Sequence, residues 1–380
     1  MSKETMETLN RFVLVGNCAN RPASWANDPE LRARNGWEDN HFDDYIPMSE
    51  VVRRLFNWEA VAVPKANLIP VGKKDANFFD SKGRPFRVMM TGDYFTDPET
   101  NLEEYLGEKG IVRSNDHSHM ATHGSSYRIH DYKHWLLNLQ QEIIGDDLKI
   151  LGAGLLRNGL QAYVQIALPE KIHDDTTGME FIPYMMAATS LDGSMPTTFS
   201  RQGLYVVCDN TRDMALRQSK GMGMIWTAKH TSRSLDLGKI EALRDTLHIL
   251  VNSAHEMRAE NQELAAIKVT RPKWLKVLDI IEPLPKPEDA TPTKITRAMN
   301  RRELLDSTYQ LDPMCALYKG TALGVVHSVN TYWTHYRQIN AGERLDRNME
   351  GVIKGQTKSV DIQTVSALSQ VLDMPELMPV

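Results

Sequence analysis

The sequence predicts an α+β fold: an antiparallel sheet backed by helices, followed by a helical C-terminal part. Short β-rich segments fill the middle of the chain, and the links between them are short and contain Gly, Asp and Pro. Such links favour antiparallel pairing, because parallel strands need long crossover connections. From Ile240 onward the apolar residues recur at helical spacing. At 380 residues, the chain is long enough for one large domain or two ordinary ones.

The N-terminal region, residues 1–59, is predicted to be rich in loops, with one short helix at 47–56. Residues 60–235 are predicted to form the α+β sheet domain, in which a helix over 135–144 precedes the central strands. Those strands are predicted at Leu148–Gly152, Ala162–Leu168, Phe181–Thr189 and Leu204–Cys208. In the last of them, Leu204, Val206 and Cys208 should share one face, because side chains alternate along a strand.

Residues 236–281 are expected to hold a long helix and the segment that follows it. Apolar residues from Ile240 to Leu264 form a heptad-like seam. The seam fits a helix packed along its own domain or, alternatively, a helix that joins copies of the chain in a homo-oligomer. Residues 282–294 are predicted to be a proline-rich linker, since proline interrupts regular helix. Residues 295–380 are predicted to be a helical C-terminal region.

Three motifs follow one another in the sheet domain. Ser190–Ser194 reads Ser-Leu-Asp-Gly-Ser, Gly203–Leu216 joins an apolar run to Asp-Asn-Thr, and Lys229–Thr231 reads Lys-His-Thr. In order and spacing these motifs resemble the phage- and plasmid-borne proteins of the domain of unknown function 932 family. The resemblance runs loosely from Val51 to Leu372, and it implies a fold and a phage or plasmid context but no chemistry. The motif residues at its most specific part are Asp192, Gly193, Asn210, Thr211 and Thr231.

Asn210 and Thr211 are expected to stand where a strand ends and a helix begins near Arg212. Either side chain would cap such a helix, and the N–H groups of a helix N-terminus can also bind phosphate. The Asp-Gly pair at 192–193 predicts a tight turn. An enzyme site could draw on Asp192, Asn210 and His230, but no G-x-S-x-G elbow surrounds the nearby serines, so no catalytic residue is expected.

Metal and cofactor sites are not expected either. The stretch from Asp116 to His134 holds five of the 12 histidines, which suits a metal site but suits a solvated loop better. The three cysteines lie far apart without a CxxC pair, which argues against a disulfide framework or a cysteine-rich zinc site. Gly152, Gly154 and Gly159 lack the Gly-Lys-Ser/Thr of a phosphate loop, so they predict a turn between strands.

Charge provides the main functional signal. The whole chain carries a net charge of −5, yet between Arg201 and Lys239 seven basic residues face only three acidic ones. Cations interleaved with aromatic rings suit a groove for single-stranded nucleic acid. The residues predicted to bind it are Arg212, Arg217, Lys220, Trp226, Lys229, His230 and Arg233. A second stretch of the same character contains Tyr332, Trp333, Tyr336, Arg337, Arg344, Arg347, Lys354 and Lys358.

The sequence therefore predicts a non-enzymatic, phage- or plasmid-encoded protein that binds single-stranded DNA, with annealing or recombination as its setting. A non-catalytic host-takeover or virion-associated interaction protein is the alternative, based on the heptad-like seam and the acidic, Trp-bearing N-terminal region. An enzyme with an unrecognised site is the second alternative. Neither a signal peptide nor a membrane span is expected, so the predicted location is the cytoplasm of an infected host cell.

Overall fold

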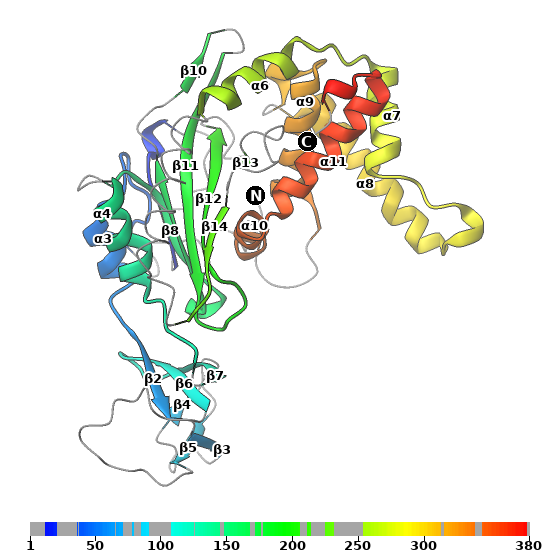
Figure 1. Ribbon diagram of the computed structural model, residues 1–380. Helices are drawn as coiled ribbons and strands as arrows, with labels where there is room; N and C mark the ends of the chain where they lie inside the picture. The colour runs from blue at the N-terminus through cyan, green and yellow to red at the C-terminus, as the bar shows by residue number, and fades with distance from the viewer. Residues whose placement is uncertain are drawn as a thin grey trace.

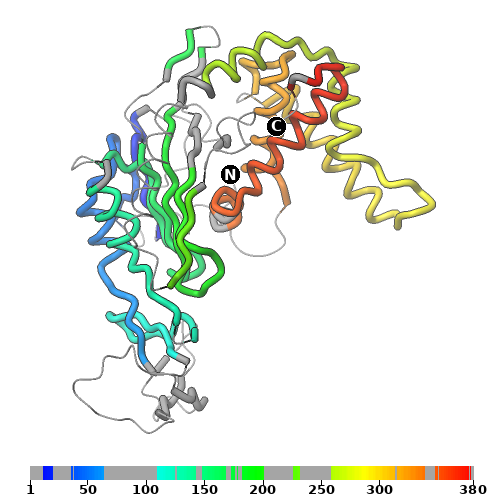
Figure 2. Tube along the Cα trace, in the orientation of Figure 1, coloured from blue at the N-terminus to red at the C-terminus, as the bar shows by residue number. Residues whose placement is uncertain are grey.

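The structure is a computed structural model of the chain. It describes residues 12–20, 36, 38–64, 66–70, 78–79, 85–90, 108–124, 126–144, 148–167, 172–175, 178–205, 211–213, 225–231, 254–312, 315–338 and 344–377. Antiparallel sheets with their covering helices precede a group of C-terminal helices, so the predicted α+β class is confirmed (Figure 1). The trace in Figure 2 passes from the sheet strands to these C-terminal helices, which lie beside the sheet.

Eight described strands form the main sheet, in which every pairing is antiparallel. Its order is β1 (Val13–Val15), β8 (Ile150–Leu156), β9 (Gln161–Ala167), β11 (Met179–Ser190), β12 (Thr197–Tyr205) and β13 (Thr211–Asp213), with β10 (Ile172–Asp174) on β11 and β14 (Ile225–Ala228) on β12. The first three predicted strands fall on β8, β9 and β11. The fourth overlaps only the end of β12, and residues 206–208 lie outside the described part of the chain.

The main sheet is buried on both faces, which explains why its strands read as nearly continuous apolar runs. On one face, Ile150 packs in the same cluster as Val51 of α3. Its neighbour Leu151 points to the opposite face and packs in a cluster with Ile353 of α10. The helices on the first face are α3 (Met48–Arg54), the π-helical turn η3 (His134–Asn138) and α4 (Leu139–Ile144). The predicted helices at 47–56 and 135–144 correspond to these elements.

Two smaller sheets extend from one end of the main sheet (Figure 1). One consists of β2 (Ala60–Pro64), β6 (Glu108–Arg113) and β7 (His119–Gly124), and the other of β3 (Ala66–Pro70), β5 (Pro85–Met90) and β4 (Phe78–Phe79). The histidine-rich stretch was expected to be a solvated loop. That expectation is wrong from His119 onward, because His119 to Gly124 form a paired strand and His130 is buried.

The hairpin between β8 and β9 is tighter than the sequence suggested. β8 continues through Gly152 and Gly154, and the turn occupies only the residues around Asn158. Gly154 leaves room for the cross-strand neighbour, because a Cβ atom there would lie 2.7 Å from the ring of Tyr163 on the neighbouring strand. In the turn, Arg157, Asn158 and Gly159 all have positive φ, at 51°, 58° and 89°. The Asn-Gly pair suits such a turn.

Five C-terminal helices of the described chain share a core of their own. They are α6 (Ala254–Ala266), α7 (Arg271–Ile281), α8 (Pro292–Leu311), α9 (Ala322–Thr331) with the π-helical turn η7 (Tyr332–Tyr336), and α11 (Gln356–Leu372). The helix α10 (Arg344–Ile353) instead packs on the main sheet. Short 3-10 turns are η1 (Cys18–Asn20), η4 (Arg157–Gly159), η5 (Pro287–Asp289), η6 (Ala316–Tyr318) and η8 (Pro375–Leu377). The proline-rich segment connects α7 to α8, and both helices contribute to one apolar cluster through Trp274 and Leu305.

The predicted seam helix is described only from Ala254 onward, since residues 232–253 lie outside the described part. Leu264, the last seam position, is 1% exposed and belongs to the C-terminal cluster. Asn261 is also buried. These two positions therefore pack within the chain, as the first interpretation of the seam expected. No helix in the described residues is long and apolar enough to cross a membrane.

Candidate nucleic-acid interface

The helix expected after Asn210 is absent where the chain is described. Thr211 to Asp213 form β13, which pairs with β12 in the register Leu204↔Thr211 and Gly203↔Arg212. The predicted helix start at Arg212 is therefore wrong. The physical reason is that Thr favours both helix caps and strands, and pairing with the edge of β12 satisfies the backbone groups that a cap would otherwise serve. Asn210, Arg217, Lys220 and Arg233 lie outside the described residues.

Trp226, expected to stack on bases, lies on β14 directly opposite Phe199. The two ring centroids are 5.3 Å apart at an interplanar angle of 52°, and Trp226 is half-buried against the main core. It therefore acts as a cross-strand packing residue. Lys229 and Thr231 are exposed beyond the end of this strand, whereas His230 between them is only 9% exposed.

Five stacked rings, here called the histidine column, run through the point where β7, β14 and the 190–195 loop meet. Their order is His123, Tyr127, His230, His130 and Trp135, and successive ring centroids are 3.7, 4.8, 4.0 and 3.8 Å apart. Tyr127 covers one face of the His230 ring and His130 covers the other. Both faces of the His230 ring are therefore covered, so this ring cannot stack on a base.

Internal hydrogen bonds hold the column in place. His230 Nδ1–H donates to the carbonyl oxygen of Arg128 at 3.0 Å, and His130 Nδ1 lies 2.6 Å from Thr197 Oγ1. Burial, and secondly the neighbouring His230, lower the pKa of His130 to about 3. Burial likewise lowers the pKa of His230 to about 4. Both imidazoles are therefore neutral near pH 7.

The 190–195 loop closes over this column as the predicted tight turn. Gly193 has a φ of 69°, and Asp192 Oδ1 accepts a hydrogen bond from Ser194 N at 2.9 Å. Ser190 Oγ donates to the carbonyl oxygen of Met195 at 2.8 Å and accepts from its N–H at 3.2 Å. The serine hydroxyl is thus engaged with backbone rather than with an imidazole. Among the described residues, no group of three His, Cys, Asp or Glu side chains is arranged to hold a metal ion.

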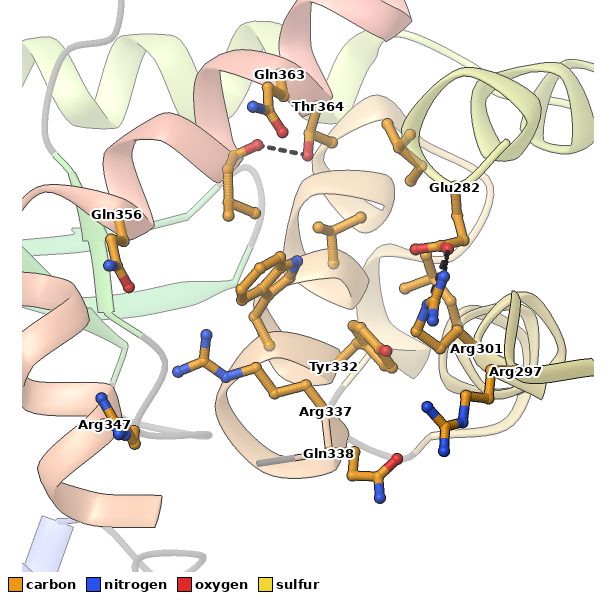
Figure 3. A pocket seen from close by; sticks show the side chains of 15 residues that line it. Glu282, Arg297, Arg301, Tyr332, Arg337, Gln338, Arg347, Gln356, Gln363 and Thr364 are labelled. Carbon is orange, nitrogen blue, oxygen red and sulfur yellow. Dashed lines mark hydrogen bonds and ion pairs between the residues drawn. The ribbon is translucent and has the colours of Figure 1, made fainter. Parts of the chain in front are cut away.

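A second feature, here called the basic cavity, lies among the C-terminal helices (Figure 3). Its volume is about 720 Å³. It is lined by Ile281 and Glu282 at the end of α7, Arg297, Arg301 and Leu305 of α8, Val329 of α9, Tyr332, Trp333, Arg337 and Gln338 around η7, Arg347 of α10, and Gln356, Val360, Gln363 and Thr364 of α11. Four of these described lining residues are arginines and one is a carboxylate. The lining therefore favours an anion.

The arginines of the basic cavity differ in their engagement. Arg301 donates two hydrogen bonds to Glu282, at 2.8 and 2.5 Å. The guanidinium of Arg337 lies 4.8 Å from the ring centroid of Trp333. Arg297 is exposed on α8 one turn before Arg301, and Figure 3 shows both arginines on the same side of the cavity. The four guanidinium groups thus reach the cavity from three elements: α8, the end of η7, and α10.

The π-helical turn η7 carries one buried and one exposed aromatic side chain at successive positions. Tyr332, at its start, is 6% exposed and belongs to the C-terminal core, and burial raises its pKa. The next residue, Trp333, is 39% exposed and lines the basic cavity. Widened turns of this kind recur at functional sites. The turn places an indole ring beside guanidinium groups, the pairing that suits a stacked base next to phosphate.

The fold brings Arg212's strand, from the first basic stretch, next to a helix that lines the basic cavity. β13, which carries Arg212, contacts α11, which lines the basic cavity. Sequence reasoning had already identified Trp333, Arg337 and Arg347, but it missed the cavity residues of α8. The available signal was the spacing of four residues between Arg297 and Arg301, which places both on one helix face.

Fold and site together define an α+β protein whose C-terminal helices enclose an arginine-lined cavity. The model of the family called domain of unknown function (DUF932) matches residues 119–370, and the chain belongs to this family. The matched residues include the whole histidine column and every described residue that lines the basic cavity. Comparison with curated proteins and with solved structures found no match.

Proposed function

We propose that this protein binds single-stranded DNA through the basic cavity. The observation that carries the proposal is a cavity of about 720 Å³ lined by four arginines, one carboxylate and an exposed tryptophan. The proposed setting is strand annealing or recombination in the cytoplasm of a host cell infected by a phage or carrying a plasmid. The protein acts here as a binding protein without catalysis.

The chemistry of the lining supports this proposal. An arginine guanidinium matches the geometry of a phosphate group and keeps its charge at all relevant pH values. Trp333 offers one π-face for a base, and base–aromatic stacking tolerates any sequence. Glu282 already pairs with Arg301, which leaves the cavity with an excess of positive charge. Phosphate and base thus find complementary groups within one cavity.

The proposal moves the binding residues away from those first predicted. The rings of Trp226 and His230 pack against other rings of the protein. The strand that carries Arg212, in contrast, lies against α11 next to the basic cavity. Arg212 and Lys229 are therefore retained as candidates that extend the binding surface, and Arg297, Arg337 and Arg347 become its centre.

The test is fluorescence anisotropy with a labelled single-stranded oligonucleotide at several salt concentrations. Arg297→Ala and Arg347→Ala should each reduce the steepness of log K against log salt by about 0.7. Each variant makes one phosphate contact fewer, so its binding releases fewer condensed counterions. Trp333→Ala should weaken binding by about 1–3 kcal/mol even at high salt, since stacking is not screened.

The matched control is Arg53→Ala. This arginine lies on α3, on the face of the main sheet away from the C-terminal helices, and it pairs with Glu38 and Glu50 (Figure 1). The substitution removes one positive charge, as Arg297→Ala does, but far from the basic cavity. The DNA affinity and its salt dependence should therefore match the wild-type values. Absence of binding at low salt, or equal effects of Arg53→Ala and Arg297→Ala, would rule out the basic cavity as the DNA site.

A second candidate function is protein–protein interaction in host takeover or in a virion. The observation in its favour is a set of exposed apolar side chains around α8: Met299 is 55%, Leu311 76% and Leu317 66% exposed. Single exposed apolar residues are common, but two on α8 and a third on the following turn η6 favour a partner. Light scattering on the wild type and on Leu311→Asp tests self-association, and a homo-oligomer unaffected by this change would point back to the seam at Ile240–Leu264.

A further inference from the structure

Three glutamines form a row along α11. Gln356, Gln363 and Gln370 follow one another at intervals of seven residues, and all three are exposed. Seven residues make nearly two helical turns, so the three side chains lie on one face at steps of about 10.5 Å. Figure 3 shows the first two along α11 at the edge of the basic cavity.

The row connects the basic cavity to a second cavity. Gln356 and Gln363 line the basic cavity. Gln363 and Gln370 line an adjoining cavity, also of about 720 Å³, between α7 and α11. Ile281 and Gln363 belong to both linings, so the two cavities adjoin at these residues. The second cavity is largely apolar, with Ile280 and Ile362 in its walls. A ligand could therefore run from a cationic part to an apolar part along one row of amides.

The amides of the row are available to a ligand. None of the three side chains is hydrogen-bonded to another part of the chain that the structure describes. Each amide offers two donors and one acceptor. That combination matches the mixed donor and acceptor edges of nucleobases, and glutamine is among the side chains that read such edges. A ligand that carried only anionic groups would use the arginines and leave the row unused.

We infer that the glutamine row contacts the base edges of an unpaired strand whose phosphates lie in the basic cavity. This inference rests on the proposed function and deepens it. In a duplex the Watson–Crick edges are occupied by the complementary strand, so a row that binds these edges accepts only splayed, single-stranded bases. The apolar walls around Ile280 and Ile362 then contact the base rings. The row thus provides selectivity for single strands, which phosphate contacts alone cannot provide.

The experiment compares two oligonucleotides of equal length, one with bases and one abasic, because both carry the same phosphates. The wild-type protein should prefer the strand with bases. The triple variant Gln356→Ala, Gln363→Ala, Gln370→Ala should lose about tenfold of that preference, while its affinity for the abasic strand stays at the wild-type value. All three residues are exposed, and the single variant Gln363→Ala, which affects both cavities, serves if the triple variant melts early.

The matched control is Gln310→Ala, a glutamine of α8 that lines neither cavity. It should leave both affinities unchanged. If the triple variant keeps the wild-type preference for bases while binding persists, the inference about the row fails and the proposed function stands. If the wild-type protein binds neither oligonucleotide, the proposed function itself fails. An equal loss for both oligonucleotides would assign the row to phosphate binding and overturn the inference.

Discussion

Acid should destabilise this protein through the two buried imidazoles of the histidine column. The folded state holds the pKa of His130 at about 3 and that of His230 at about 4, whereas an unfolded chain has a histidine pKa near 6.5. Between these values the unfolded state therefore binds protons that the folded state does not bind. The stabilisation is complete above pH 6.5 and declines as the pH falls toward the two folded values.

The magnitude follows from linkage. Each proton bound only by the unfolded chain lowers the free energy of unfolding by about 1.4 kcal/mol per pH unit. At pH 5, which is about 1.5 units below the unfolded pKa, each histidine has lost about 2 kcal/mol of its stabilisation. The two rings are 4.0 Å apart and each would oppose the charge on the other, so the folded state stays neutral over this range.

The assay is urea unfolding, monitored by tryptophan fluorescence, at pH 7, 6 and 5. His130→Phe keeps a flat ring between Trp135 and His230 but removes one titrating group, so its stability should fall less steeply with pH than that of the wild type. His173→Gln, at an exposed position on β10, is the control and should keep the wild-type slope. Parallel curves for wild type and His130→Phe would refute the reasoning.

Two further predictions concern packing and capping. Gly154→Ala should destabilise the sheet by about 1–3 kcal/mol, because its Cβ would lie 2.7 Å from the ring of Tyr163; Gly124→Ala, with no atom within 4 Å, should melt like the wild type in a thermal scan. Thr321→Ala removes the N-cap of α9, where the side chain accepts from Gly324 N at 3.0 Å. It should cost about 1 kcal/mol in urea unfolding, and an unchanged midpoint would contradict the cap.

Local patterns predicted much of the sheet. The strand expected at Ala162–Leu168 is β9 (Gln161–Ala167), and the one expected at Phe181–Thr189 lies within β11 (Met179–Ser190). These predictions succeeded because β-rich residues bounded by turn residues define a strand within a few positions. The prediction at Thr211 failed because residues that cap helices also occur in strands, and only the neighbouring strand decides between them.

The histidine column shows a different limit. Sequence analysis considered the five histidines of 116–134 together, as a loop or as a metal site. In the structure His123 and His130 stack instead with Tyr127 and with His230, which lies a hundred residues further along the chain. No local pattern contains the information that β14 returns beside this segment, since that depends on the register of the whole sheet.

By itself, the sequence determined the class of fold, the resemblance to the family and the excess of basic residues in two stretches, because each depends on composition, spacing or local pattern. Only the tertiary structure decided which of those residues form a site. Trp226 and His230 became packing residues once β14 paired with β12 and the rings stacked. The arginines of α8 and the glutamine row of α11 became neighbours because their helices share a core that no linear pattern specifies.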